Sequence, residues 1–210
     1  MGRANKPSYL NSNYGVEMTS RAGIVSRIYW RLLRLTGFGK YAWDQQFKKG
    51  FWSRGRHSEF FINKVVSLND GGFLIEFGCA EGVLVEELPR SVYSKYLGLD
   101  ISGIAIGIAR ERVRAIGIDN CLFEERDMVH WAGSVDASLI VLEECLYYLS
   151  PSQVKKFLDK CKLSLLPSGT ILVIDHSAEK HAVTLQVCRS RCRVIEERVF
   201  EGRTYLTLGK

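Results

Sequence analysis

Acidic side chains end four of the segments that the sequence predicts as buried strands. They are Glu76, Asp100, Asp127 and the pair Glu143-Glu144. In an open parallel sheet the carboxyl ends of the strands share one edge, and ligands bind at that edge. We therefore expect these carboxylates to line one pocket. Their charge and their capacity to accept hydrogen bonds suit a ribonucleoside that carries a positive charge.

A glycine-containing loop, Glu76-Phe77-Gly78-Cys79-Ala80-Glu81-Gly82, follows the first of these strands. Gly78 allows the chain to turn sharply, and Gly82 allows a ligand to approach the backbone closely. The helix that follows would direct its first amides at the ligand. The dinucleotide fingerprint G-x-G-x-x-G is not matched, because Ala80 replaces its middle glycine and its third glycine is absent. Taken alone, the loop could also be a generic strand-to-helix turn.

Short apolar runs and helix-periodic segments alternate from residue 72 onward. The predicted strands are 72–78, 95–100, 121–127, 135–144 and 168–176, and the predicted helices are 82–89, 102–116, 150–165 and 178–190. Residues 192–209 predict two further strands around the turn Glu201-Gly202. This order predicts an α/β fold with a doubly wound, mostly parallel sheet of seven strands and a C-terminal antiparallel hairpin.

Residues 1–60 carry the positive charge of the protein. They hold eleven Lys and Arg residues against three acidic ones, a net charge of +8, whereas the rest of the chain carries −2. Periodic apolar positions predict an amphipathic helix over 21–36 and a short helix around 43–49. We expect residues 1–60 to form an arm and a basic helical cap, and residues 61–210 to form the ligand-binding domain. A hypothesis is that Arg27, Arg31 and Arg34 attract an anionic acceptor or a membrane surface, and a solvated charged face is the alternative.

The overall composition is that of a soluble globular protein, with 46% hydrophobic and 25% charged residues. No stretch approaches the ~18 consecutive apolar residues of a membrane-spanning helix. The six cysteines form no C-x-x-C pair, so we expect reduced thiols and no metal site. These features predict a cytoplasmic protein.

The ordered set of motifs resembles the class I S-adenosylmethionine-dependent methyltransferases. The segments that carry the resemblance are LIEFGCAEG (74–82), YLGLDIS (96–102), EERDM (124–128), DASLIVLEECLYYL (136–149) and LLPSGTILVIDH (165–176). The match spans about residues 70–210, and GCAEG with LEECLYYL looks most like the nodulation-protein-S type of small bacterial enzymes. The resemblance implies a Rossmann-like methyltransferase fold, S-adenosylmethionine as cofactor, and methylation of an N or O atom of a small-molecule or sugar-derived acceptor.

The resemblance also implies roles for residues at the methionine end of the cofactor. The loop residues that would line this end are Glu76, Gly78, Cys79, Ala80 and Gly82. Glu143 lies where this family contacts the methionyl amine. Ala80 stands where glycine is commoner, and it is small enough to leave the loop intact.

At the nucleoside end, the resemblance assigns four positions that follow the second and third strands. Asp100 would hold the ribose hydroxyls, and Ile101 would lie against the adenine. Asp127 would accept a hydrogen bond from the adenine amine, and Met128 would lie beside the ring.

Methyl transfer from a sulfonium is an in-line displacement, so the enzyme mainly aligns the two reactants and excludes water. A hydroxyl acceptor also needs a general base, and an amine acceptor must be unprotonated. The candidates near the strand ends are His176, Glu144, His130 and Tyr147. His176, directly after Asp175, is the first choice, and a polar residue at a loop mouth is the alternative for each. We expect His57 and His181 to be surface residues.

Two other functions stay open at this point. An RNA methyltransferase would suit the basic segment, but the sequence contains no RNA-binding module and no Asn-Pro-Pro-Tyr type motif after the fourth strand. A non-catalytic scaffold that has lost its cofactor is disfavoured by the set Glu76, Asp100 and Asp127. The acceptor, the methylated atom and the oligomeric state do not follow from the sequence.

Overall fold

The computed structural model describes residues 39–50, 52, 55–133 and 136–210. The chain divides into two compact units, 1–42 and 43–210. Of the first unit, the structure describes residues 39–42, the first residues of helix α2 (Gly39–Lys48). This helix begins four residues before the predicted start. The predicted helix over 21–36, with Arg27, Arg31 and Arg34, lies outside the described residues.

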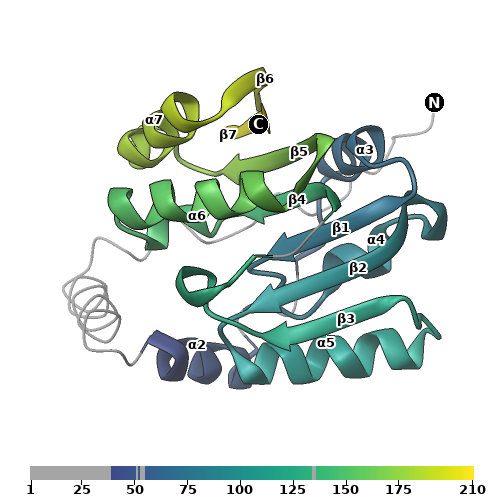
Figure 1. The fold of residues 1–210 in the computed structure, drawn as a ribbon. Helices are drawn as coiled ribbons and strands as arrows, with labels where there is room; N and C mark the ends of the chain where they lie inside the picture. The colour runs from purple at the N-terminus through teal and green to yellow at the C-terminus, as the bar shows by residue number, and fades with distance from the viewer. Residues whose placement is uncertain (1–38, 51, 53–54, 134–135) are drawn as a thin grey trace, which may run out of the picture. The chain divides into compact units, whose positions relative to one another are not determined.

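A sheet of seven strands in the order β3-β2-β1-β4-β5-β7-β6 forms the centre of the second unit (Figure 1). Neighbours among β1 to β5 are parallel, β7 runs antiparallel to β5, and β6 runs antiparallel to β7. The strands are β1 (Gly72–Phe77), β2 (Tyr93–Asp100), β3 (Cys121–Glu125), β4 (Ala137–Glu143), β5 (Leu165–Asp175), β6 (Arg193–Phe200) and β7 (Arg203–Gly209). The prediction of a doubly wound, mostly parallel α/β sheet with a C-terminal antiparallel hairpin is confirmed.

Besides α2, the described residues form five α-helices before and between these strands. They are α3 (Glu59–Leu68), α4 (Val83–Glu87), α5 (Gly103–Ala115), α6 (Pro151–Ser164) and α7 (Ala182–Arg191). Serine side chains cap three of them: Ser58 begins α3, Ser102 begins α5, and Ser150 begins α6 in a reciprocal capping box with Gln153. Helix α3 was not predicted from the sequence, although Ser58 is a recognisable N-cap.

The central strands of the sheet are buried on both faces, whereas β3 and β6 at its two edges are largely exposed. On β4, Ile140 and Leu142 pack into one core with α6 and α7, whereas Leu139 and Val141 pack into the other with α3, α4 and α5. Alternate residues of a strand point to opposite faces, so a strand covered on both sides must be apolar throughout. This is why the central strands read as continuous apolar runs in the sequence.

The parallel strands end at one edge of the sheet, where the arrowheads of β1, β2 and β3 lie together in Figure 1. The loops after β1, β2, β4 and β5 follow strands that are paired on both sides, whereas β3 is an edge strand paired with β2 alone. Within the described residues, no helix is long and apolar enough to cross a membrane. The six cysteines are free, and the described part of the chain contains no metal-ligand cluster.

Candidate active site

The loop after β1 turns through three residues in the left-handed region: Gly78 (φ 72°), Ala80 (φ 47°) and Gly82 (φ 71°). The amides of Gly78 and Cys79 both donate to the carbonyl oxygen of Leu99, at 2.8 and 3.2 Å, which ties the loop to β2. A Cβ on Gly82 would lie 3.0 Å from Ala109 Cβ and 3.1 Å from the Phe123 ring. Gly82 is therefore needed for both backbone conformation and close packing.

Asp100, at the end of β2, is 9% exposed and accepts a backbone hydrogen bond on each carboxylate oxygen. The amide of Ala80 donates to Oδ2 at 3.0 Å, and that of Ser102 donates to Oδ1 at 2.8 Å. Burial raises the pKa of Asp100 to about 6, and the charge of Asp44 adds to the rise. Each oxygen keeps a lone pair that could accept a hydroxyl hydrogen. This geometry suits two vicinal hydroxyls.

Asp44 contacts the first turn of α5, next to Asp100. Sequence analysis did not predict this contact. The Ser102 hydroxyl donates to Asp44 Oδ1 at 2.6 Å, and the Ile104 amide donates to the same oxygen at 3.3 Å. Asp44 precedes Ser102 by 58 residues, so no local spacing links them. It adds a second carboxylate to the first turn of α5, where negative charge is favoured.

Glu76, near the end of β1, is 3% exposed. Its Oε2 accepts a hydrogen bond from the buried Tyr96 hydroxyl. Burial raises the pKa of Glu76 to about 7, against the lowering effects of Tyr96 and of the His57 charge. A carboxylate buried to this extent is stabilised by a cationic partner. The residues at the end of β1 therefore fit a ligand that carries an ammonium group.

His57 is not the surface residue expected from the sequence. Its Nδ1 lies 2.8 Å from Glu87 Oε2, and its Nε2 lies 3.0 Å from Glu143 Oε2. Burial lowers the pKa of His57, but the hydrogen bond and charge of Glu143 outweigh burial and raise it to about 9. The second oxygen of Glu143, Oε1, lies 3.0 Å from Arg203 Nη1. Each oxygen of Glu143 thus has a cationic neighbour.

The residues predicted to bind the nucleoside follow β2 and β3. Asp127 Oδ1 accepts from the Val129 amide at 2.8 Å, which caps the short 3-10 turn Met128–His130. The amide of Arg126 donates to the Asp100 carbonyl at 2.7 Å, so this segment lies beside the end of β2. Met128 and Ile101 are half-buried, and Met128 packs against the core. The predicted nucleoside-binding residues therefore follow two adjacent strand ends.

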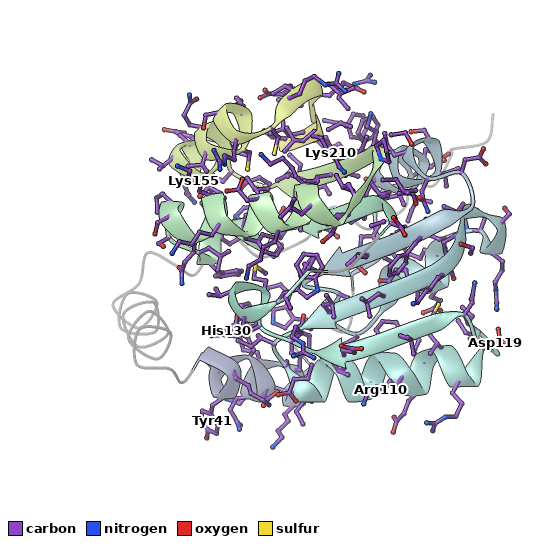
Figure 2. The ribbon with its side chains drawn as sticks, viewed as in Figure 1. Tyr41, Arg110, Asp119, His130, Lys155 and Lys210 are labelled. Atoms are coloured by element: carbon purple, nitrogen blue, oxygen red, sulfur yellow. The ribbon has the colours of Figure 1, made fainter. Side chains whose placement is uncertain are left out.

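Three of the four candidate bases lie together at the ends of β4 and β5. His176 Nδ1 contacts Glu144 Oε2, and the Tyr147 ring meets the His176 ring edge-on at 5.5 Å. The fourth, His130, pairs instead with Asp127 Oδ2 at 3.3 Å, and its side chain is 80% exposed. His130, labelled in Figure 2, ends the 3-10 turn Met128–His130 that follows β3. The structure therefore does not support His130 as part of the same catalytic group.

His181, expected at the surface, belongs to this cluster as well. Its Nδ1 lies 2.9 Å from both oxygens of Asp175, and its ring stacks on Tyr147 at 4.0 Å and 14°. Burial and the neighbouring Tyr148 raise the pKa of Tyr147 far above its usual range. The Tyr147 ring contacts both His176 and His181, so it can hold the two imidazoles in their orientations.

An aromatic surface continues from this cluster. Tyr147 and Tyr148 lie 4.6 Å apart, Trp43 meets Tyr148 edge-on at 5.2 Å, and Trp52 lies 5.7 Å from Trp43. Trp43 and Trp52 come from residues 1–60, the segment predicted to form the arm and the basic helical cap. Aromatic surfaces of this kind exclude water and bind the faces of flat or cyclic molecules.

Sequence analysis missed His57 and His181, and the two differ in whether their spacing from their carboxylate partners could have revealed them. His57 precedes Glu87 by 30 residues and Glu143 by 86, so no local pattern links them. His181 is six residues after Asp175, at the start of α7. A histidine within one loop of a strand-end aspartate is a signal that could have been used.

The comparisons with known proteins agree with this arrangement. Residues 74–169 match a family model described as a methyltransferase domain. The fold is similar to that of the N-methyltransferase NodS from Bradyrhizobium japonicum WM9 in complex with S-adenosyl-L-homocysteine, at 17% identity and TM-score 0.61, covering 71% of this chain and 83% of that one. No curated protein matches this chain in sequence.

Two further solved structures share the fold. One is a methyltransferase from Leishmania major that depends on S-adenosylmethionine, at 18% identity and TM-score 0.60, covering 71% of this chain and 70% of that one. The other is a methyltransferase from Aquifex aeolicus with the same dependence, at 16% identity and TM-score 0.59, covering 71% and 87%. The family model covers the glycine loop and the ends of β1 to β4. Residues 74–169 therefore match a methyltransferase domain, and the chain shares its fold with solved methyltransferases that depend on S-adenosylmethionine.

Proposed function

We propose that this protein is an enzyme that transfers the methyl group of S-adenosylmethionine to an oxygen or nitrogen atom of a small-molecule acceptor. Sugar-derived acceptors are the first class to test. The observation that carries the proposal is the contact of His176 with Glu144, one residue beyond Glu143 of the cofactor pocket. A histidine oriented by a carboxylate is suited to remove a proton from an acceptor. Its position next to the pocket would place that acceptor near the methyl donor.

On the cofactor side, Asp100 would hold the ribose hydroxyls and Asp127 the adenine amine. Glu76 and Glu143 would meet the ammonium group at the methionine end. The burial of Glu76 and Asp100 supports these roles, because a carboxylate removed from water interacts strongly with a charged or hydroxyl partner. S-adenosylmethionine supplies a methyl group activated by a sulfonium.

On the acceptor side, Glu144 would accept the Nδ1 hydrogen of His176 and fix the tautomer of the ring. The free Nε2 would then take the acceptor proton. Tyr147 holds His176 from one side and His181 from the other. The aromatic residues Trp43 and Tyr148 would exclude water from the transfer.

Both nitrogen and oxygen acceptors stay within the proposal. Similar folds occur in NodS, named as an N-methyltransferase, and in NcsB1, an O-methyltransferase solved with S-adenosylmethionine and 2-hydroxy-5-methyl naphthoic acid. These similarities are at 17% and 14% identity, so they support the fold and leave the acceptor open. The role of Arg27, Arg31 and Arg34 in attracting an anionic acceptor stays a prediction.

A screen with methyl-labelled cofactor tests the proposal. The purified chain is incubated with panels of amines, hydroxylated aromatics, sugars and structured RNA, and label transfer is measured. We expect transfer to a small acceptor. Transfer to RNA alone would favour the RNA methyltransferase. Failure to bind the cofactor at millimolar concentration, measured by calorimetry, would favour the non-catalytic scaffold.

A further inference from the structure

His57 bridges two carboxylates that come from different parts of the fold. Glu87 is the last residue of α4, and Glu143 is the last residue of β4. The His57 Nδ1 and backbone amide both contact Glu87 Oε2, at 2.8 and 3.1 Å, while Nε2 contacts Glu143 Oε2 at 3.0 Å. A neutral imidazole can donate from one nitrogen only. Two carboxylate partners therefore call for the imidazolium form, in agreement with the raised pKa.

The position of the imidazole is set by elements outside the cofactor loop. His57 lies two residues before α3, and its ring packs on Phe61 at 4.8 Å. Ser58 caps α3 by accepting from the Phe61 amide at 3.2 Å. The side chains of His57, Glu87 and Glu143 are 15%, 10% and 16% exposed. The bridge is thus largely withdrawn from water. The strength of a buried ion pair depends strongly on its geometry.

The charges around His57 alternate. Glu76 and Glu143 are acidic, and His57 and Arg203 are cationic neighbours of Glu143. The charge of His57 also acts on Glu76. The amino-acid end of the cofactor is a zwitterion, with an ammonium and a carboxylate on one carbon. A mixed set of acidic and cationic groups matches a zwitterion better than carboxylates alone.

We propose that His57 is a positioning residue for the amino-acid end of the cofactor: Glu87 anchors it, and it holds Glu143 in place. The inference rests on the proposed role of Glu143 in the cofactor pocket. Without the imidazolium, Glu143 keeps Arg203 as its cationic neighbour, and the carboxylates of Glu76, Glu87 and Glu143 repel one another. His57 acts through Glu143 and is not itself a catalytic residue.

Calorimetry with two ligands tests this role. S-adenosylhomocysteine carries the amino-acid end, whereas 5′-methylthioadenosine has the same nucleoside and thioether without it. We expect His57→Gln to weaken S-adenosylhomocysteine binding roughly tenfold and 5′-methylthioadenosine binding less than about twofold, because only the first ligand reaches Glu143. The matched control is Lys64→Gln, which removes the ion pair of α3 with Glu196 on β6 and should change neither affinity.

A second variant keeps the test decisive if His57→Gln folds poorly. Glu87→Gln leaves His57 in place but removes its anchor charge, and we expect a smaller loss with the same ligand selectivity. In the double variant the loss should not exceed that of His57→Gln, because Glu87 acts through His57.

Unchanged or tighter S-adenosylhomocysteine binding in both variants would overturn the role of His57. Equal losses for the two ligands, with a lower unfolding temperature, would reduce it to a structural residue. A wild-type chain that fails to bind S-adenosylhomocysteine would instead overturn the proposed pocket as a whole, so the two failures are distinguishable.

Discussion

The ends of β1 and β2 and the ends of β4 and β5 form two regions of different construction. In the first, Glu76 and Asp100 are buried and held by Tyr96 and by backbone amides. In the second, Glu144 and His176 pair with each other, and their side chains are 23% and 49% exposed. Groups fixed by backbone suit a ligand of constant shape, and exposed side-chain pairs on loops can be varied for different partners.

The boundary between the two regions falls between two consecutive residues, Glu143 and Glu144. Glu143 contacts His57 and Arg203 on the proposed cofactor side, whereas Glu144 contacts His176 on the proposed acceptor side. Arg203 also lies 3.9 Å from Glu144, so it contacts both carboxylates. Glu144 has a φ of 52°, a left-handed conformation that is unfavourable for a residue with a side chain. Its amide still donates to the Ile174 carbonyl at 3.0 Å, so β5 holds this turn in place. The local strain is consistent with a functional position.

The largest effect is expected on the acceptor side. His176→Gln should lower the turnover number roughly 10²–10⁴-fold for a hydroxyl acceptor, because the proton acceptor is lost. Cofactor affinity, measured by calorimetry, should stay within about twofold of wild type, since His176 contacts the acceptor-side cluster. A loss of cofactor affinity as large as the loss of turnover would show that the two regions are not separable.

A pH titration of stability tests the charge of His57 at the border of the cofactor region. The folded-state pKa is raised from 6.5 to about 9, so its stabilisation is fully present below pH 6.5 and is lost as pH rises through 9. Relative to His57→Gln, the wild-type free energy of unfolding should fall by on the order of 3 kcal/mol over this window. The free energies of unfolding are measured by chemical denaturation at each pH. If those of wild type and His57→Gln change equally with pH, Glu87 and Glu143 do not hold His57 in its charged form.

A smaller effect, a loss of ligand affinity, is expected from a substitution in the proposed cofactor region itself. Asp100→Ala should weaken S-adenosylhomocysteine binding roughly 10–100-fold, because a charged hydrogen-bond acceptor is lost and the amides of Ala80 and Ser102 lose their partner. The matched ligand control lacks the 2′-hydroxyl of the ribose. If Asp100→Ala weakens binding of that analogue as much as it weakens binding of the parent ligand, Asp100 does not hold this hydroxyl.

Much of the fold could be predicted because its signals are local. The central strands β1, β4 and β5 are largely apolar on both faces, and glycine, proline and serine mark the element ends. The predicted strand over 72–78 corresponds to β1 (Gly72–Phe77), and the predicted turn at Glu201-Gly202 joins β6 and β7. Helix α3 was missed because its ten residues, with two fully buried side chains, present only a short apolar pattern.

The sequence by itself determined the type of sheet and the placement of carboxylates at its edge, because the ends of parallel strands necessarily meet there. Only the tertiary structure decided how those carboxylates are used. The separation of Glu143 from Glu144, and the pairing of His57 and His181 with carboxylates, depend on side chains from segments far apart in the chain or across a turn. Such contacts depend on how helices and loops pack against the sheet; among them, the six-residue spacing of His181 from Asp175 is local, whereas no residue spacing links His57 to its two carboxylates.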